Sequence, residues 1–271
     1  MINFLHSFNP NPVLFDLGPF TIYWYGFFIV IGMMLGIVIT LKLAKMFKIS
    51  ENIVMDLAFW LIIFSIIGAR IYHIILQFSY YLQNPLQVFM IWNGGIAIHG
   101  AIIAGLLTIY YFSRKYKLSF LKISAIIAPS LALAQAIGRW GNYFNQELFG
   151  KPTSLPWGIP ISSVSLPADF VGNLYFHPTF LYESLGNLLI FAILILIIFF
   201  IKKKDRLKLE YIPFIYLMLY SSLRIATEFI RIDQTPVIFG FRFPQLISTI
   251  IIILSVYFLY RETKRAPIEK N

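Results

Sequence analysis

The chain contains long apolar runs, and a backbone in hydrocarbon must satisfy its own hydrogen bonds, which restricts it to helices or a closed barrel. A helix of about 20 residues crosses the bilayer core. The runs that reach or approach this length lie at approximately 19–42, 53–79, 88–113, 120–138, 178–201, 211–231 and 243–261. Because 59% of the residues are hydrophobic and 13% charged, we predict an all-α integral membrane protein with seven transmembrane helices.

The positions of the basic residues explain the net charge of +10. Lysine and arginine gather after the first, third, fifth and seventh runs, which all end on the same side of a seven-helix bundle. By the positive-inside rule this side is the cytoplasm, so the N-terminus is expected outside and the C-terminus inside. The charge therefore predicts orientation and no nucleic-acid partner. These basic residues are Lys42, Lys45, Lys48, Arg114, Lys115, Lys117, Lys122, Lys202, Lys203, Lys204, Arg206, Lys208, Arg261, Lys264, Arg265 and Lys270.

No repeat or low-complexity linker divides the chain, so we predict one transmembrane catalytic domain over residues 1–271. Residues 139–177, with four prolines, are expected to form a small irregular cap outside the cytoplasm, inserted between two helices. The first 20 residues lack the positive region and cleavage site of a signal peptide, so the first helix is expected to remain in the protein. The chain has no cysteine, so any thiol chemistry must use the sulfur of a partner.

Several remaining basic residues are arginines near the outer ends of different helices, among them Arg70, Arg139 and Arg224. A charge at a helix centre costs about 2.5–3.5 kcal/mol, so such residues commonly face a cavity or a partner. A single arginine near a helix end can instead extend to the water. The sequence leaves both readings open for each arginine alone, but together they indicate a positive site at the depth of the outer leaflet.

Arg224, Glu228 and Arg231 share one helix face, because they stand at i, i+4 and i+7. One reading is a local stripe of ion pairs. However, two arginines against one glutamate leave a positive charge, which is expensive to bury without an anion. The planar guanidinium grips phosphate through paired hydrogen bonds. We therefore predict that this face binds the phosphate of a phospholipid headgroup.

The segment "GRWGNYFNQELFG" at 138–150 places Arg139, Asn142 and Glu147 between glycines, after the fourth apolar run. Arg139 and Glu147 can simply pair while the glycines form turns, or the arginine and asparagines can surround an anion. Farther along, Glu183 is also able to pair with an arginine. His99, in "GGIAIHGAIIAG", is either a hydrogen-bonding residue between helices or a catalyst, since its ordinary pKa suits proton transfer.

These and other motifs occur in the order seen in prolipoprotein diacylglyceryl transferases, a family of bacterial membrane enzymes that the chain resembles almost from end to end. The resemblance implies transfer of the diacylglyceryl group of phosphatidylglycerol to the lipobox cysteine thiol of prolipoproteins, with release of glycerol 1-phosphate. It also implies a location in the bacterial cytoplasmic membrane. The motifs are "YWYG" at 23–26, "GARIYH" at 68–73, "HGA" at 99–101, "GRWGNYFNQELFG" at 138–150, "PWGI" at 156–159, "HPTFLYE" at 177–183 and "RIATEFIR" at 224–231.

By the same resemblance, Arg139 and Arg224 are expected to bind the lipid phosphate. The family positions that support the site are Asn142, Glu147, Gly150, Glu228 and Arg231, and those implicated in activity are Tyr25, His99 and Tyr220. His99 is the candidate base, although the arginines alone can also lower the pKa of the incoming thiol. No metal cluster or cofactor motif is visible. The alternative function is a non-catalytic phospholipid or anion transporter, although transporters usually place their sites near the midplane and show repeats.

Overall fold

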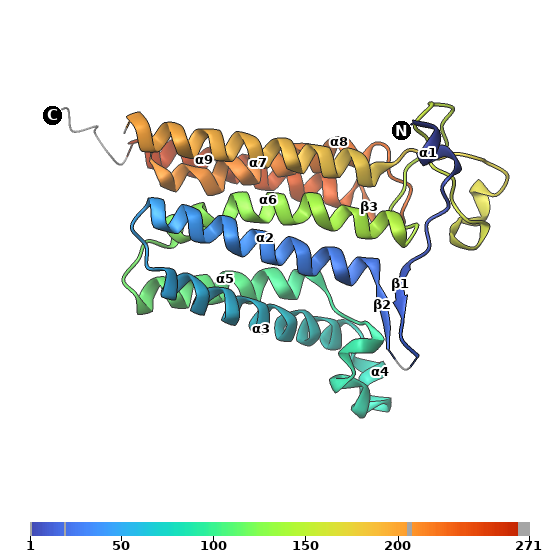
Figure 1. Cartoon of the computed structure of the whole chain (residues 1–271), viewed down its shortest axis with the longest axis horizontal. Helices are drawn as coiled ribbons and strands as arrows, with labels where there is room; N and C mark the ends of the chain where they lie inside the picture. The colour runs from blue at the N-terminus through green and yellow to red at the C-terminus, as the bar shows by residue number, and fades with distance from the viewer. Residues whose placement is uncertain (1, 19, 205–207, 265–271) are drawn as a thin grey trace. The chain divides into compact units, whose positions relative to one another are not determined.

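The computed structural model describes residues 2–18, 20–204 and 208–264 (Figure 1). The expected cytoplasmic residues Arg206, Arg265 and Lys270 lie outside the described residues. Long helices dominate the structure. They are α2 (Trp24–Met46), α3 (Glu51–Leu76), α5 (Ile98–Lys115), α6 (Phe120–Phe144), α7 (Thr179–Lys204), α8 (Ile212–Glu228) and α9 (Phe243–Lys264).

The remaining elements are short. Two antiparallel hairpins pair β1 (Val13–Asp16) with β2 (Thr21–Tyr23) and β3 (Val237–Ile238) with β4 (Phe241–Arg242). The short helices are α1 (Ile2–Ser7), α4 (Phe78–Gln83), η1 (Pro85–Phe89), η2 (Ile91–Asn93), η3 (Ser163–Ser165), η4 (Ala168–Phe170) and η5 (Leu209–Tyr211).

Five helices in the described part of the chain, α2, α3, α6, α7 and α9, are long and apolar enough to cross a membrane. The helices α5 and α8 have 18 and 17 residues and do not meet the same limits. Both carry polar groups near the middle or the end, such as Arg114 in α5 and Arg224 in α8. These findings support a mostly helical, multi-pass membrane protein.

Three expected helix boundaries were wrong. The first run was expected to be helical from 19, but Thr21–Tyr23 form β2 and α2 begins only at Trp24. The third run was expected to be helical from 88, but α5 begins only at Ile98. Gly94 and Gly95 have φ of 84° and 73°, which lies outside the helical region, so they separate the short turns η1 and η2 from α5. The fourth run was expected to end at Gly138, yet α6 continues to Phe144. A glycine inside a helix costs only about 0.5–1 kcal/mol, and the packing of the last two turns of α6 outweighs it.

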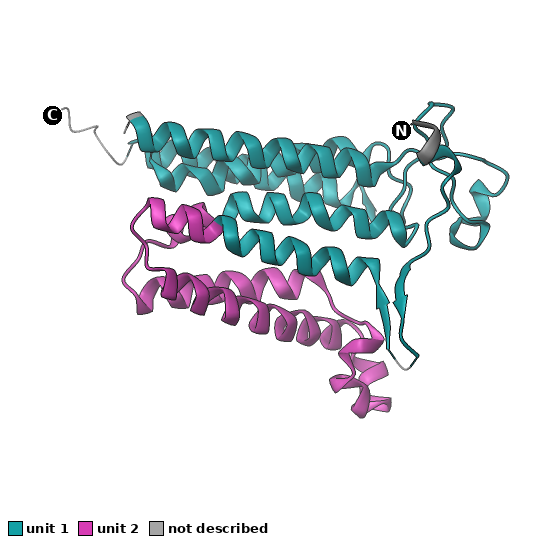
Figure 2. Ribbon diagram, in the orientation of Figure 1, with its two compact units in different colours: residues 1–39, 127–271 teal, residues 40–126 magenta. Residues whose placement is uncertain are grey.

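The chain forms two compact units, which Figure 2 colours separately. In unit 2, residues 40–126, α3 packs against α5. A Cβ added at Gly68 of α3 would lie 2.6 Å from the carbonyl oxygen of Gly100 in α5. Two glycines therefore allow the backbones of these helices to touch, as small residues do between membrane helices.

Unit 1 comprises residues 1–39 and 127–271 and contains α8 packed against both α7 and α9. The connection from α6 to α7, expected as an irregular cap at 139–177, begins only after Phe144 because α6 is longer than expected. Its backbone forms isolated bridges from Pro152 and Ile159 to Phe176, which is fully buried. The ring of His6 in α1 stacks on Tyr175 at 3.5 Å between ring centroids. These contacts hold the connection against the N-terminal segment.

Candidate active site

Four arginines and three carboxylates of unit 1 form one continuous cluster of ion pairs. They come from segments that are far apart in the sequence and meet because α6, α7 and α8 belong to one packed unit. We call this set the arginine cluster. Its members are Arg139 of α6, Glu183 of α7, Arg224 and Glu228 of α8, Arg231 and Asp233 of the following loop, and Arg242 of β4.

Glu183 is the carboxylate shared by three of these arginines. Its Oε2 lies 2.5 Å from Nη2 of Arg139. Its Oε1 lies 3.0 Å from Nη1 of Arg231 and 3.9 Å from Nη1 of Arg224. The sequence indicated that Glu183 is able to pair with an arginine, and the structure confirms it, but that it joins three of them was missed. A lone acidic residue near the start of a very apolar run was the available signal.

Glu228 is fully buried and pairs with arginines on both sides. It forms an ion pair with Nη2 of Arg224, and its Oε2 lies 2.9 Å from Nε of Arg242. The expected set of two arginines and one glutamate was incomplete, because Arg139, Glu183, Asp233 and Arg242 also take part. One positive charge remains within the arginine cluster, and the nearby Glu147 balances it. Charge excess alone does not require a bound anion, so the free donors of each arginine matter more.

The four arginines differ in their exposure and in how many of their hydrogen-bond donors have a partner. Arg231 has a side chain only 3% exposed and donates to Asp233 at 2.7 Å and to Glu183 at 3.0 Å. The side chains of Arg139 and Arg224 are each 19% exposed. Within the described residues, no hydrogen bond or ion pair engages Nε of either one. Arg139 and Arg224 thus combine access with free donors, as a ligand-binding pair requires.

Arg242 was not expected in the site from the sequence. Its Nη2 donates to the backbone carbonyl of Asp233 at 2.6 Å, and its Nη1 donates to that of Glu228 at 3.3 Å. Burial opposes ionisation of Asp233, but the hydrogen bond and charge of Arg231, followed by the charge of Arg242, hold the pKa of this carboxyl below its usual value. This arrangement folds the loop after α8 back onto the helix end.

The segment 138–150 contributes a second layer of hydrogen bonds. Asn142 is buried, donates from Nδ2 to Oε1 of Glu147 at 2.7 Å and accepts from Arg139 at 3.4 Å. Asn145 also donates to Glu147, at 3.4 Å. One reading left open for Arg139 was a direct ion pair with Glu147. Within the described residues the two side chains form no such pair. Arg139 pairs with Glu183, and Asn142 connects it to Glu147.

Two glycines of this segment have a packing role. A Cβ added at Gly141 would lie 2.6 Å from Cδ2 of Tyr25, so this glycine lets α6 rest on the ring of Tyr25 at the start of α2. Gly150 forms an isolated backbone bridge with Arg231. Both expected site residues, Tyr25 and Gly150, are therefore in contact with segments that carry arginines of the cluster.

Tyr220 stands one turn before Arg224 on α8. Tyr216, Tyr220, Arg224 and Glu228 recur at intervals of four residues and share one helix face. The rings of Tyr216 and Tyr220 stack with centroids 5.9 Å apart, and the hydroxyl of Tyr216 donates to Oε1 of Gln135 at 3.0 Å. This pair lines the face of α8 that leads to the arginine cluster.

His99 belongs to unit 2, where it is the second residue of α5 and is exposed. Its ring centroid lies 5.8 Å from that of Tyr72 on α3. The neighbouring Gly100 is buried at the contact with Gly68. The backbone next to His99 is therefore fixed by the close crossing of α3 and α5.

The guanidinium group of Arg70 donates its hydrogen bonds to backbone carbonyls and not to an anion. It is buried, and its Nη1 donates to Gly94 at 2.6 Å and to Gly95 at 2.7 Å. Its Nε donates to Val88 at 3.0 Å, and its Nη2 donates to Gln87 and Met90. The sequence grouped Arg70 with the arginines of an outer-leaflet anion site, and this was wrong for Arg70. It caps the turns between α4 and α5.

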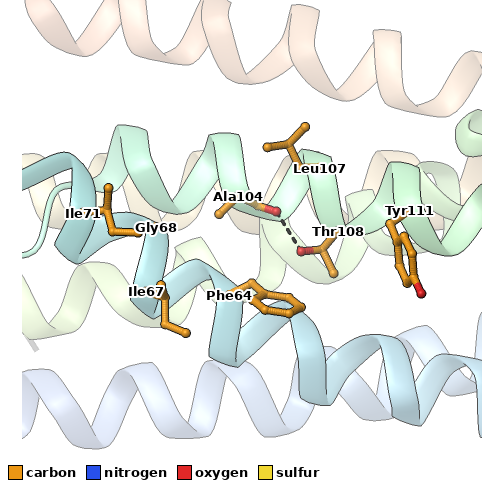
Figure 3. A pocket seen from close by; sticks show the side chains of 8 residues that line it. All are labelled: Phe64, Ile67, Gly68, Ile71, Ala104, Leu107, Thr108 and Tyr111. Carbon is orange, nitrogen blue, oxygen red and sulfur yellow. Dashed lines mark hydrogen bonds between the residues drawn. The ribbon is translucent and has the colours of Figure 1, made fainter.

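Unit 2 also contains an apolar cavity of about 310 Å³ (Figure 3). Its lining has no charged side chain, and the hydroxyl of Thr108 donates to the carbonyl of Ala104 at 2.8 Å. The cavity is suited to hydrocarbon and not to phosphate. The lining residues are Phe64, Ile67, Gly68, Ile71, Ala104, Leu107, Thr108 and Tyr111.

Comparison with known proteins agrees with the motifs. A profile of the family described as prolipoprotein diacylglyceryl transferase matches residues 12–261. Relatives of the chain carry the name phosphatidylglycerol–prolipoprotein diacylglyceryl transferase, and three of them are compared with it below. The one from Nostoc sp. is 45% identical, over 83% of this chain and 80% of the relative. Those from Synechococcus sp. and Finegoldia magna are 42% and 43% identical, over 96% and 90% of this chain and 96% and 92% of the relatives. The chain therefore belongs to the prolipoprotein diacylglyceryl transferase family.

Proposed function

We propose that the chain transfers the diacylglyceryl group of phosphatidylglycerol to the thiol of the lipobox cysteine of a prolipoprotein and releases glycerol 1-phosphate. As a member of its family the chain is a transferase of lipoprotein biosynthesis. The observation that carries the proposal is the pair Arg139 and Arg224, which share the carboxylate of Glu183 and keep their Nε donors free among the described residues. Paired guanidinium groups suit a phosphodiester.

The reaction replaces a carbon–oxygen bond by a carbon–sulfur bond. The thiolate sulfur supplies an electron pair to the glycerol carbon that carries the phosphate. The electrons of the broken bond leave with the phosphate oxygen, and the phosphodiester becomes a phosphomonoester with one more negative charge. Arg139 and Arg224 bind this phosphate, and their attraction grows as charge develops on it. Binding that strengthens in the transition state is what accelerates the chemical step.

The thiol must lose its proton before it attacks, since an ordinary thiol of pKa about 8.5 is mostly protonated at neutral pH. We assign His99 as the base that accepts this proton. His99 is exposed at the start of α5, and an imidazole is a common general base in enzymes. The alternative is that the positive arginines lower the pKa of the thiol and His99 only orients a substrate.

The other site residues support the phosphate binders. Asn142 and Glu147 orient Arg139 through hydrogen bonds, and Glu228 and Arg231 hold Arg224 and Glu183 in place. The remaining residues of the proposed site are Tyr25, Gly150 and Tyr220. We place them beside the lipid headgroup on the basis of the family motifs.

We place all seven long helices across the bacterial cytoplasmic membrane, with the N-terminus outside and the C-terminus in the cytoplasm. The basic residues that follow α2, α5 and α7 and close the chain after α9 support this orientation. It puts Arg139, near the end of α6, and Arg224, near the end of α8, at the outer side of the membrane. A signal peptide cysteine and the headgroup of an outer-leaflet lipid would meet there.

The test incubates the purified full chain with phosphatidylglycerol and a synthetic peptide that contains a lipobox cysteine. Mass spectrometry is expected to detect a thioether-linked diacylglyceryl peptide, and none when serine replaces the cysteine. Arg139→Ala is expected to lower the rate by about a hundredfold or more, whereas the exposed Arg261→Ala serves as a matched arginine control with normal activity. A folded wild-type protein that forms no lipidated peptide would contradict the proposal. The transporter alternative instead requires lipid movement without product.

A further inference from the structure

We propose that Glu183 is a positioning residue for this transfer, an internal counter-ion that sets the geometry of Arg139 and Arg224 and competes with the lipid phosphate for both. The inference rests on the proposed function, because it takes the phosphate as the ligand of the two arginines. It concerns a residue that acts through the arginines and does not need to touch the substrate.

The two oxygens of Glu183 divide the arginines between them. Oε2 contacts Arg139 at hydrogen-bond distance, 2.5 Å, whereas Oε1 contacts Arg231 at 3.0 Å. Nη1 of Arg224 is 3.9 Å from the same Oε1, too far for a hydrogen bond. Arg224 is therefore attracted by the charge of Glu183 without being tied to it. Its Nη1 remains able to turn to a second oxyanion.

The backbone that carries Glu183 is fixed against the segment that carries Arg139. The hydroxyl of Ser184 donates to the carbonyl of Ala136 in α6 at 2.8 Å. The hydroxyl of Thr179, at the start of α7, donates to the carbonyl of Leu148. Asn187 is fully buried and donates to the carbonyl of Glu183 at 2.7 Å. These bonds fix the backbone around Glu183 relative to the segment of Arg139, which its carboxylate contacts.

A carboxylate and a phosphate present the same kind of acceptor to a guanidinium group. When Glu183 loses its charge, Arg139 and Arg224 lose their shared counter-ion, and the net positive charge felt by a phosphate rises by one. A phosphate should then bind more tightly. The arginines also lose the contact that orients them for the leaving group, so the chemical step should slow down. Opposite changes in phosphate affinity and in kcat distinguish this role from simple loss of structure, which would weaken both.

The experiment compares the wild type with Glu183→Gln and Glu183→Asp in the transfer assay and titrates inorganic phosphate as an inhibitor. For Glu183→Gln we expect kcat to fall by about a hundredfold and the inhibition constant of phosphate to fall by about tenfold. Glu183→Asp keeps the charge but withdraws it by one methylene, so both values should lie between those of the wild type and Glu183→Gln. Asp169→Asn removes an exposed charge outside the arginine cluster and should change neither value.

Weaker phosphate inhibition together with a lower kcat would overturn the proposal, and so would wild-type values of both constants in Glu183→Gln. If Glu183→Gln does not fold, Glu183→Asp decides the question by the same opposite shifts, and wild-type values in it would refute the role. A wild type that forms no lipidated peptide would refute the proposed function instead. Direct binding of inorganic phosphate, measured by calorimetry on the same proteins, would still test the competition with Glu183.

Discussion

The backbone of Gly150 forms an isolated antiparallel bridge with Arg231. Next to it, the amide of Gly150 donates to the carbonyl of His177 at 2.9 Å, and the amide of Lys151 donates to the carbonyl of Ile230 at 2.9 Å. A Cβ added at Gly150 would lie 2.7 Å from Cγ2 of Ile230 and 2.8 Å from Cβ of His177. The absence of a side chain at Gly150 is therefore what lets three segments meet beside the arginine cluster.

We predict that Gly150→Ala lowers the free energy of unfolding by about 1–3 kcal/mol, because the added methyl group overpacks a close contact. The measurement is the midpoint of thermal unfolding in detergent. Gly138→Ala is the matched control from the same motif, since a Cβ there would meet no atom within 4 Å and alanine favours a helix. An equal loss of stability in both variants would show that the close contact at Gly150 is not the cause.

A second prediction concerns Arg70, whose guanidinium supplies donors to the turns between α4 and α5. Arg70→Gln is expected to lower the free energy of unfolding by at least about 2 kcal/mol, because buried carbonyls lose their donors. The KM for phosphatidylglycerol should stay near the wild-type value in the protein that remains folded. A normal unfolding midpoint combined with a much higher KM would instead identify Arg70 as a ligand of the lipid.

The helices and the site differ in how far the sequence could predict them. The apolar runs located α2, α3, α6, α7 and α9, because burial in hydrocarbon needs only local composition and length. The start of α5 was missed because the run stays mostly apolar across Gly94 and Gly95, whose positive φ interrupts the helix and whose carbonyls Arg70 holds. Arg139 and Arg224 were predicted as phosphate binders from their depth and motifs, and the structure brings both of them to Glu183. The partners Asp233 and Arg242 were missed because the loop between them is held by hydrogen bonds from the side chain of Arg242 to the carbonyls of Arg231 and Asp233, which leave no periodic pattern.

A third prediction follows from Asp233. Arg231 and Arg242 hold the pKa of this carboxyl below its ordinary value of 3.8, against the opposing effect of burial. The unfolded chain then binds the proton more readily, so the stabilisation is complete above the unfolded pKa and is lost as the pH falls through the folded pKa. The unfolding midpoint of Asp233→Asn should lie below that of the wild type by a constant amount above about pH 5. The gap should shrink as the pH falls below the unfolded pKa of 3.8 and close only below the depressed folded pKa. A gap that widens in acid would contradict this assignment.

The last prediction separates the two roles open to His99. If the imidazole accepts the thiol proton, His99→Gln should lower kcat by about 10²–10⁴-fold, the usual contribution of a general base. The rate of the variant should then rise with pH up to the pKa of the thiol, because only the thiolate formed in solution can react. If the arginines alone activate the thiol, the variant should keep nearly normal transfer and the pH profile of the wild type. Measuring the rate between about pH 6 and pH 9 in both proteins distinguishes the two, since that range spans the ordinary pKa values of an imidazole and a thiol. Near-normal transfer by His99→Gln would rule out an obligatory base at this position and leave Arg139 and Arg224 as the groups that make the sulfur reactive.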